Sequence, residues 1–103
     1  MRKLLWRSIQ FSSEFKKITR SGSKIHTPFF IFFNIKPDKF KLGVVASRKV
    51  GSAVERNRAK RLLRNAFSHA YKHADSATVL IAKPAIISAA YKEIQRWMDK
   101  TTA

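Results

Sequence analysis

The chain has 103 residues, and its 22 lysines and arginines against 6 acidic residues give a formal net charge of +16. This excess is typical of proteins that bind nucleic acids or anionic membranes, whereas 45% hydrophobic residues exclude a purely disordered basic tail, and the length predicts one domain over residues 1–103. The absence of cysteine excludes disulfides and thiolate zinc sites.

The first half of the chain contains one predicted helix and two predicted strands. A serine cap and an acidic first turn predict a short helix over residues 12–22. Residues 29–35 are aromatic and β-branched and predict a strand, residues 36–39 predict a turn, and the alternating residues 40–47 predict a second strand. The pattern leaves open whether residues 26–28 begin a further short strand.

The second half contains two predicted helices and a buried strand. Residues 52–73 predict a long helix, residues 78–82 a strand, and Ser88 caps a final helix. The final helix carries an apolar face formed by Tyr91, Ile94, Trp97 and Met98. The order predicts an α+β fold, a two-layer sandwich of three helices on a mixed sheet of about four strands (αβββαβα).

Residues 52–73 form an amphipathic helix with one strongly basic side. Its apolar stripe leaves the opposite side to Asn57, Lys60, Arg61 and Arg64, with Arg56 and Arg58 on the flanks. Four like-charge pairs at i,i+3 or i,i+4 spacing cost the helix roughly 1–2 kcal/mol, and no acidic residue between Glu55 and Asp75 compensates them. We therefore favour a polyanionic partner over a merely solvated surface.

Motifs for protein-borne catalysis are absent from the sequence. The chain has no cysteine nucleophile, no phosphate-binding glycine loop and no HExxH motif, and its six carboxylates are scattered. His69 and His73 have a spacing that can chelate zinc, but too few candidates remain for a third ligand. We therefore expect no metal site in the protein and place any catalytic groups on a partner.

The aromatic residues 29–33 have two interpretations. Because side chains alternate along a strand, one set packs under the helices and the other faces elsewhere. Aromatic side chains beside a basic groove can hold single-stranded nucleic acid by stacking, although core packing is the more frequent role of any single phenylalanine.

Residues 41–61, KLGVVASRKVGSAVERNRAKR, closely resemble the signature of the bacterial ribonuclease P protein subunit. Weaker similarity extends to Phe15 and Gly22, to the aromatic strand, and to residues 81–84, in the family's order. The resemblance implies the protein cofactor of a ribozyme, in which the RNA subunit holds the Mg²⁺ that removes the 5′ leader of precursor tRNA. It also implies a left-handed crossover around the long helix, against the usual right-handed rule.

The resemblance further implies which residues meet each RNA. Contacts with the catalytic RNA are expected from Arg48, Lys49, Arg56, Asn57, Arg58, Lys60, Arg61 and Arg64. Contacts with the leader of precursor tRNA are expected from Phe15, Phe30 or Phe33, and Lys83. The sequence departs from the family at Thr19, where an aromatic residue is common, at Ala77, where an acidic residue is usual, and at Lys83, which replaces an arginine.

Other functions share some of these features. A small basic ribosomal protein, or a general RNA-binding protein without a role in catalysis, has the same charge and size. A DNA-binding protein needs groove-reading residues, and a membrane-active helix needs bulkier apolar residues opposite the charge. The longest apolar run, residues 28–35, is too short to span a bilayer, and no signal peptide is apparent. We expect a cytoplasmic protein with no membrane partner and no obligate protein partner.

Overall fold

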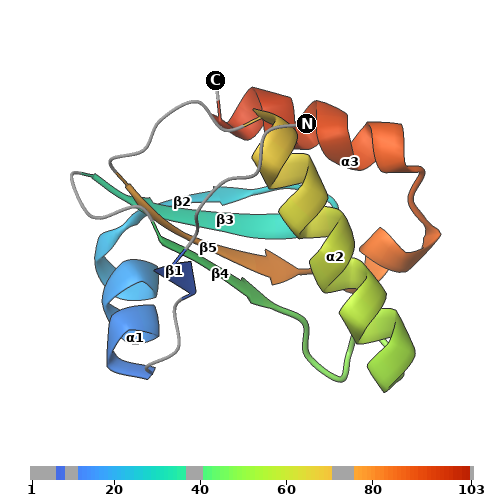
Figure 1. The fold of residues 1–103 in the computed structure, drawn as a ribbon, viewed down its shortest axis with the longest axis horizontal. Coiled ribbons are helices and arrows are strands. Elements are labelled where there is room, and N and C mark those ends of the chain that lie inside the picture. The colour runs from blue at the N-terminus through green and yellow to red at the C-terminus, as the bar shows by residue number, and fades with distance from the viewer. Residues whose placement is uncertain (1–6, 9–11, 37–40, 71–75, 103) are drawn as a thin grey trace.

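The computed structural model describes residues 7–8, 12–36, 41–70 and 76–102. They form three helices, a short 3₁₀ helix and one five-stranded sheet (Figure 1). In chain order the elements are β1 (Arg7–Ser8), α1 (Ser12–Ser21), β2 (Ser23–His26), β3 (Phe30–Ile35), β4 (Lys41–Val45), α2 (Ala53–Ala70), β5 (Ala77–Ala82), η1 (Pro84–Ser88) and α3 (Tyr91–Thr102).

The sheet is mixed, with the strand order β1-β4-β5-β3-β2. Strands β4 and β5 are parallel neighbours joined by α2, whereas β3 is antiparallel to both β5 and β2. In Figure 1, β4 and β5 run from left to right, β5 lies above β4, and α2 crosses on the viewer's side. The crossover is therefore left-handed, as the family resemblance implies and contrary to the usual rule.

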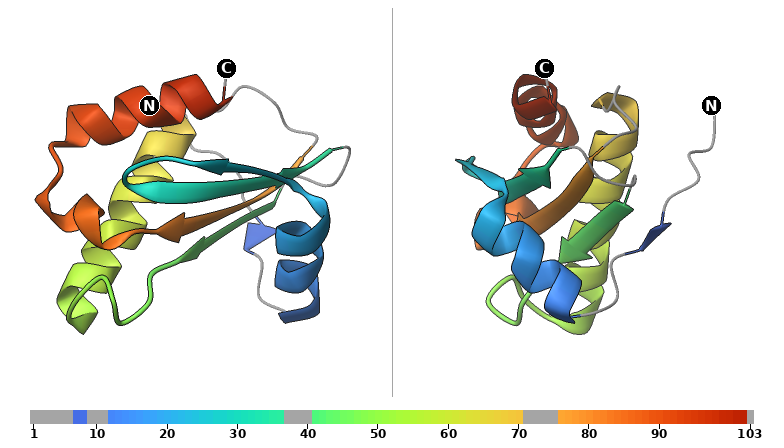
Figure 2. Two further views of the ribbon diagram at one scale, coloured as in Figure 1. Left: turned by 180° about the vertical axis from the view of Figure 1, so that it is seen from behind. Right: turned by 90° about the vertical axis from the view of Figure 1, so that its left-hand side faces the viewer.

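The predicted α+β fold with three helices on a mixed sheet is confirmed, and the helices lie on both faces of the sheet, α2 and α3 on one and α1 on the other (Figure 2). One core lies between the sheet and the pair α2 and α3, and includes Phe30, Leu80 and Phe67. A smaller core lies between the other face and α1, and includes Ile18 and Phe33. The aromatic strand β3 supplies side chains to both cores, because its residues alternate between the two faces.

Most predicted elements are confirmed, with local differences. The uncertain strand lies earlier than residues 26–28, at β2, and the two-residue β1 was not predicted. Ser88 ends η1 and does not cap α3; instead the Ala90 carbonyl accepts hydrogen bonds from the amides of Glu93 and Ile94, at 3.0 and 3.3 Å.

The remaining differences concern Tyr91 and two segment ends. Tyr91 is 38% exposed, so it does not belong to the fully buried face of α3, which holds Ile94 and Met98. The predicted turn at residues 37–39 and the predicted helix end at residues 71–73 lie outside the described residues. Within the described part of the chain, no helix is long and apolar enough to cross a membrane.

Candidate nucleic-acid interface

A tight turn between β4 and α2 presents two of the predicted basic residues. The Val50 amide donates to the Ser47 carbonyl at 3.0 Å, and the Gly51 amide donates to the Arg48 carbonyl at 3.2 Å. Val50 is buried and anchors the turn, while Arg48 and Lys49 remain exposed at its tip. The turn therefore delivers two cations to solvent directly before the basic helix.

The start of α2 is fixed by a reciprocal capping box. The Glu55 amide donates to the Ser52 hydroxyl at 3.3 Å, and the Glu55 carboxylate accepts from the Ser52 amide at 3.0 Å. Gly51 precedes this box with φ of +149°, and a Cβ there would clash with the Glu55 carboxylate. Glu55, the single carboxylate of α2, is thus engaged in the cap of its own helix.

Replacing Ser52 by alanine is expected to lower the free energy of unfolding by about 1 kcal/mol, because the first turn loses its side-chain acceptor. Urea unfolding measures this change. The Ser52→Asp variant keeps an acceptor at the cap and serves as the control, with stability close to that of the wild type. Equal stability of wild type and Ser52→Ala would show that the capping box contributes nothing.

The two sides of α2 differ in burial as the periodicity predicts. Its buried side chains are Ala59, Leu63, Ala66, Phe67 and Ala70. We call the opposite surface the cationic face, formed by Arg56, Asn57, Arg58, Lys60, Arg61 and Arg64. Asn57, Arg58, Arg61 and Arg64 are exposed, whereas Arg56 and Lys60 are half-buried. Lys60 therefore lies on the flank of the helix and not opposite the apolar stripe.

Within the described residues, no acidic side chain forms an ion pair with the cationic face. Arg56 is tied to the protein, because its Nη1 donates to the Gly51 carbonyl at 3.3 Å. Among the residues that the structure describes, no ion pair or hydrogen bond engages the side chains of Arg58, Arg61 or Arg64. Their guanidinium groups are available to fork onto phosphates.

A second surface lies on the other face of the sheet, beside α1. Phe15 of α1 is half-buried against Phe33 and Ile18, and Lys24 on β2 lies over the Phe33 ring at 5.6 Å. Helix α1 packs on one end of this face, and Ile31 remains partly exposed.

The strand register extends this second surface across the sheet. Ile31 pairs with Ile81 and Ile81 pairs with Val45, so three partly exposed apolar side chains form a row. Lys83 follows Ile81 in extended conformation and lies on the same face at the end of β5. We call Phe15, Phe33, Ile31, Ile81 and Lys83 the sheet surface. Ile31 and Ile81 were not selected from the sequence, because strand alternation gives their spacing from Phe33 but not the pairing between strands.

Phe30 does not belong to this surface, which corrects the prediction that it lines the leader site. It is fully buried in the opposite core, under α2 and α3, and is paired with Ala82 in the sheet register. Its ring cannot stack on RNA without unfolding the domain. Of the two candidate strand aromatics, only Phe33 lies on the same face as Phe15.

Thr19 occupies the position at which the ribonuclease P protein family commonly has an aromatic residue. Its hydroxyl donates to the Phe15 carbonyl at 3.0 Å and to the Lys16 carbonyl at 3.2 Å, so it is satisfied within α1.

His69 is exposed near the end of α2, and His73 lies outside the described residues. In the described part of the chain, no group of three or more potential metal ligands lies together.

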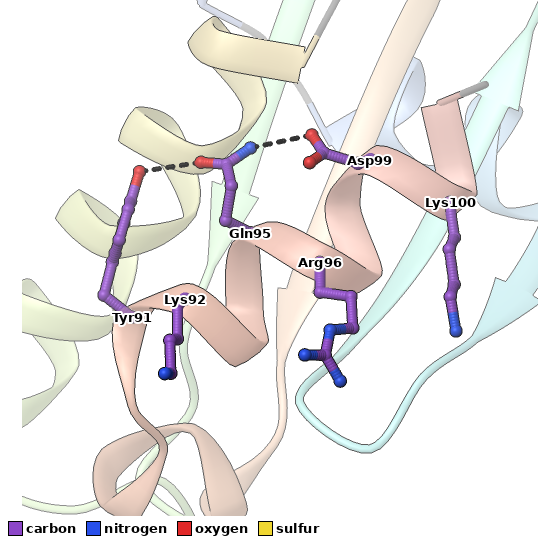
Figure 3. Close-up of a pocket in the computed structure, with 6 residues that line it drawn as sticks. All are labelled: Tyr91, Lys92, Gln95, Arg96, Asp99 and Lys100. Atoms are coloured by element: carbon purple, nitrogen blue, oxygen red, sulfur yellow. Dashed lines mark hydrogen bonds between the residues drawn. The ribbon is translucent and has the colours of Figure 1, made fainter.

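A different polar surface runs along α3 (Figure 3). Tyr91 donates to Gln95 at 2.9 Å, and Gln95 donates to Asp99 and to the Ala66 carbonyl, both at 3.0 Å. Burial and, secondarily, the Asp99 charge raise the pKa of Tyr91, so its hydroxyl stays a donor. Lys92, Arg96 and Lys100 extend along the same hollow, which has a volume of about 510 Å³. Because carboxylates are mixed with the cations, this surface is less one-sided than the cationic face.

Comparisons with known proteins show the family of this chain. A family model for ribonuclease P matches residues 7–103. The ribonuclease P protein component of Nitratiruptor sp. is 36% identical over 94 residues, which cover 90% of this chain and 86% of that protein. The corresponding protein of Bacillus pumilus is 34% identical over 80 residues, covering 72% of this chain and 67% of the relative.

Solved structures give the same result for the fold. The ribonuclease P protein of Staphylococcus aureus superimposes with a TM-score of 0.78 at 26% identity, covering 90% of this chain and 89% of that one. The protein from Thermotoga maritima has the same TM-score at 20% identity, which supports the fold alone. With its cationic helix, its fold and these relatives, the chain belongs to the ribonuclease P protein family, the protein component of the ribonucleoprotein that processes the 5′ end of precursor tRNA.

Proposed function

We propose that this chain binds the catalytic RNA of ribonuclease P through its cationic face and holds the 5′ leader of precursor tRNA on the sheet surface. The observation that carries the first part is the one-sided charge of α2. Arg58, Arg61 and Arg64 are exposed together without an ion pair to any described acidic residue, so repulsion among them is relieved when phosphates bind.

The sheet surface suits a single-stranded RNA. The half-buried ring of Phe15 and the apolar side chains of Ile31 and Ile81 can contact unstacked bases, and Lys83 can neutralise a phosphate at their edge. Since Phe33 is almost fully buried, it exposes little of its own ring and belongs to the core cluster against which Phe15 packs. The aliphatic side chains of Ile31 and Ile81 thus provide contacts in place of the aromatic residue that is common in the family at position 19.

The two RNA-binding surfaces lie on opposite faces of the sheet but meet at one of its ends. Strands β4 and β5 are parallel neighbours, so the residues that follow them leave the sheet at the same end. Arg48 and Lys49 follow β4, and Lys83 follows β5. These cations provide a basic connection from the catalytic RNA to the leader, which would bring the substrate beside the ribozyme.

In this proposal the protein positions RNA and the ribozyme performs the hydrolysis. The cationic face offers guanidinium groups, an ammonium and an amide, a donor set that does not suit Mg²⁺. We therefore place the catalytic Mg²⁺ in the RNA subunit. The function also implies a cytoplasmic site of action, with no membrane partner and no obligate protein partner.

Cleavage of precursor tRNA by a bacterial ribonuclease P RNA at low Mg²⁺, with and without this protein, tests the proposal. Strong stimulation of correct 5′ cleavage is expected, because the protein adds binding energy that high Mg²⁺ otherwise replaces. A folded protein that binds the RNA without stimulating cleavage would instead favour a general RNA-binding role.

Replacing Phe15 by alanine is expected to weaken binding of precursor tRNA to the holoenzyme by about tenfold, the size of one lost stacking contact. Binding of mature tRNA, which lacks the leader, should be almost unchanged. Affinities of both tRNAs for the variant holoenzyme give the measurement.

The Phe15→Leu variant separates stacking from packing, because leucine fills the contact with Ile18 and Phe33 but has no planar face. It should fold normally and still bind precursor tRNA more weakly than the wild type. Equal losses for precursor and mature tRNA in both variants would contradict a leader contact at Phe15.

A further inference from the structure

Val54 is an exposed apolar residue at the start of the cationic face. Its exposed fraction is 78%, compared with 41% for Ile25 and 38% for Tyr91, the other large hydrophobic residues exposed in the described part of the chain. It lies in the first turn of α2, where residues three, four and seven positions later share its side of the helix. Those residues are Asn57, Arg58 and Arg61, the most outward part of the cationic face.

The local structure does not require valine at this position. Ser52 and Glu55 form the helix cap without it, and a β-branched residue lowers helix propensity relative to alanine. Single exposed apolar side chains are common on protein surfaces. What distinguishes Val54 is its setting, since it shares its side of α2 with Arg58 and Arg61, and Asn57 lies one turn away.

We propose that Val54 and Asn57 together form a contact site for one unpaired nucleobase of the catalytic RNA, with Arg58 and Arg61 binding the phosphates on either side. The valine methyl groups cover the face of the base, and the Asn57 amide, which offers both a donor and an acceptor, binds its edge. This inference rests on the proposed function and extends it. The cationic face would then recognise a particular place on the RNA, in addition to attracting phosphates.

Salt dependence distinguishes the two kinds of contact. A phosphate contact releases counterions, so its loss reduces the slope of log K against log salt by somewhat less than one unit. An apolar contact with a base releases none, so its loss lowers affinity at every salt concentration by the same factor. The variants Val54→Ala and Val54→Thr test the apolar contact, Asn57→Ala tests the amide, and Arg58→Ala provides the phosphate reference.

Binding of each variant to the catalytic RNA and to an unrelated RNA duplex is measured over a range of salt concentrations. For Val54→Ala, Val54→Thr and Asn57→Ala we expect about fivefold weaker binding to the catalytic RNA, an unchanged salt slope, and unchanged binding to the duplex. Because alanine is the better helix former, Val54→Ala should melt no earlier than the wild type, and its loss of affinity is not a loss of fold. The double variant Val54→Ala with Asn57→Ala should lose less than the product of the single losses, because both residues contact one base.

Wild-type affinity in both Val54 variants would overturn the proposal, as would a parallel loss on the duplex. If the loss of affinity in the double variant equals the product of the two single losses, the two residues do not contact one and the same base. Failure of the proposed function gives a different result from failure of this inference, because the wild-type protein itself would then bind the catalytic RNA no more tightly than the duplex.

Discussion

Replacing Arg58 and Arg61 together by alanine is expected to weaken binding of the catalytic RNA by about a hundredfold at physiological salt, roughly tenfold for each lost charge-assisted contact. Both side chains are exposed on α2, and in the described part of the chain neither has an acidic partner. The slope of log K against log salt should fall by about 1.4 to 1.8 units, since two phosphates are no longer neutralised.

The same double variant should be as stable as the wild type, or slightly more stable. Arg58 and Arg61 are three positions apart on one helix, so they repel each other in the free protein by about 0.2–0.5 kcal/mol. Affinity and stability are therefore expected to change independently or in opposite directions. A loss of helix content measured by circular dichroism would contradict this expectation, because it would assign the two arginines a structural role.

The surface of α3 supplies a matched control for this double variant. Lys92 and Arg96 are both exposed, and the Arg96 side chain, 62% exposed, makes only a long 3.7 Å ion pair with Glu93. Replacing both by alanine removes the same formal charge as the α2 variant but leaves the cationic face intact. If the two double variants lose affinity equally, the net charge of the protein governs binding and the proposed interface is wrong.

The sequence predicted the cationic face well because two independent patterns coincide on α2. The apolar stripe at Ala59, Leu63, Ala66 and Phe67 determines which side of the helix is buried, and the arginines occupy the remainder. Only the flanks were ambiguous, since a helical projection cannot decide how far neighbouring elements extend around the helix. Lys60 is half-buried for this reason.

The sheet surface was harder to predict because both faces of β3 are apolar. In a strand with one wet face, polar residues mark the outside, but here helices lie on both faces and Phe30 and Phe33 look alike in the sequence. Asn34, the polar residue in β3, is also buried, and its amide donates to the hydroxyls of Ser76 and Thr78 at 3.1 and 2.8 Å. These partners lie more than forty positions along the chain, so local pattern could not identify them.

Short elements escaped prediction for a different reason. Strand β1 has two residues and η1 has five, too few for a periodic pattern to emerge. The 3₁₀ helix η1 follows from Pro84, which fixes the first turn, and from Ile86, which is fully buried against the core. Because η1 extends to Ser88, the residue at the start of α3 that accepts its first hydrogen bonds is Ala90 and not Ser88.

Replacing Phe30 by alanine is expected to lower the free energy of unfolding by about 3–5 kcal/mol, because a fully buried ring is replaced by a cavity between the sheet and α2 and α3. That loss is a large fraction of the roughly 5–15 kcal/mol by which domains are usually stable. Urea unfolding gives the size of the effect, and the Phe15→Ala variant on the opposite face provides a comparison with a half-buried ring.

The assignment of Phe30 to the core rests on more than stability, because a destabilised protein also loses RNA binding. The Phe30→Leu variant keeps most of the buried volume and should remain folded, with a smaller loss of about 1–2 kcal/mol. Since its side chain stays under α2 and α3, the folded variant should bind precursor tRNA as tightly as the wild type. Weaker leader binding by a Phe30→Leu protein that is fully folded at the assay temperature would return Phe30 to the RNA surface and would contradict the separation of the two faces of the sheet.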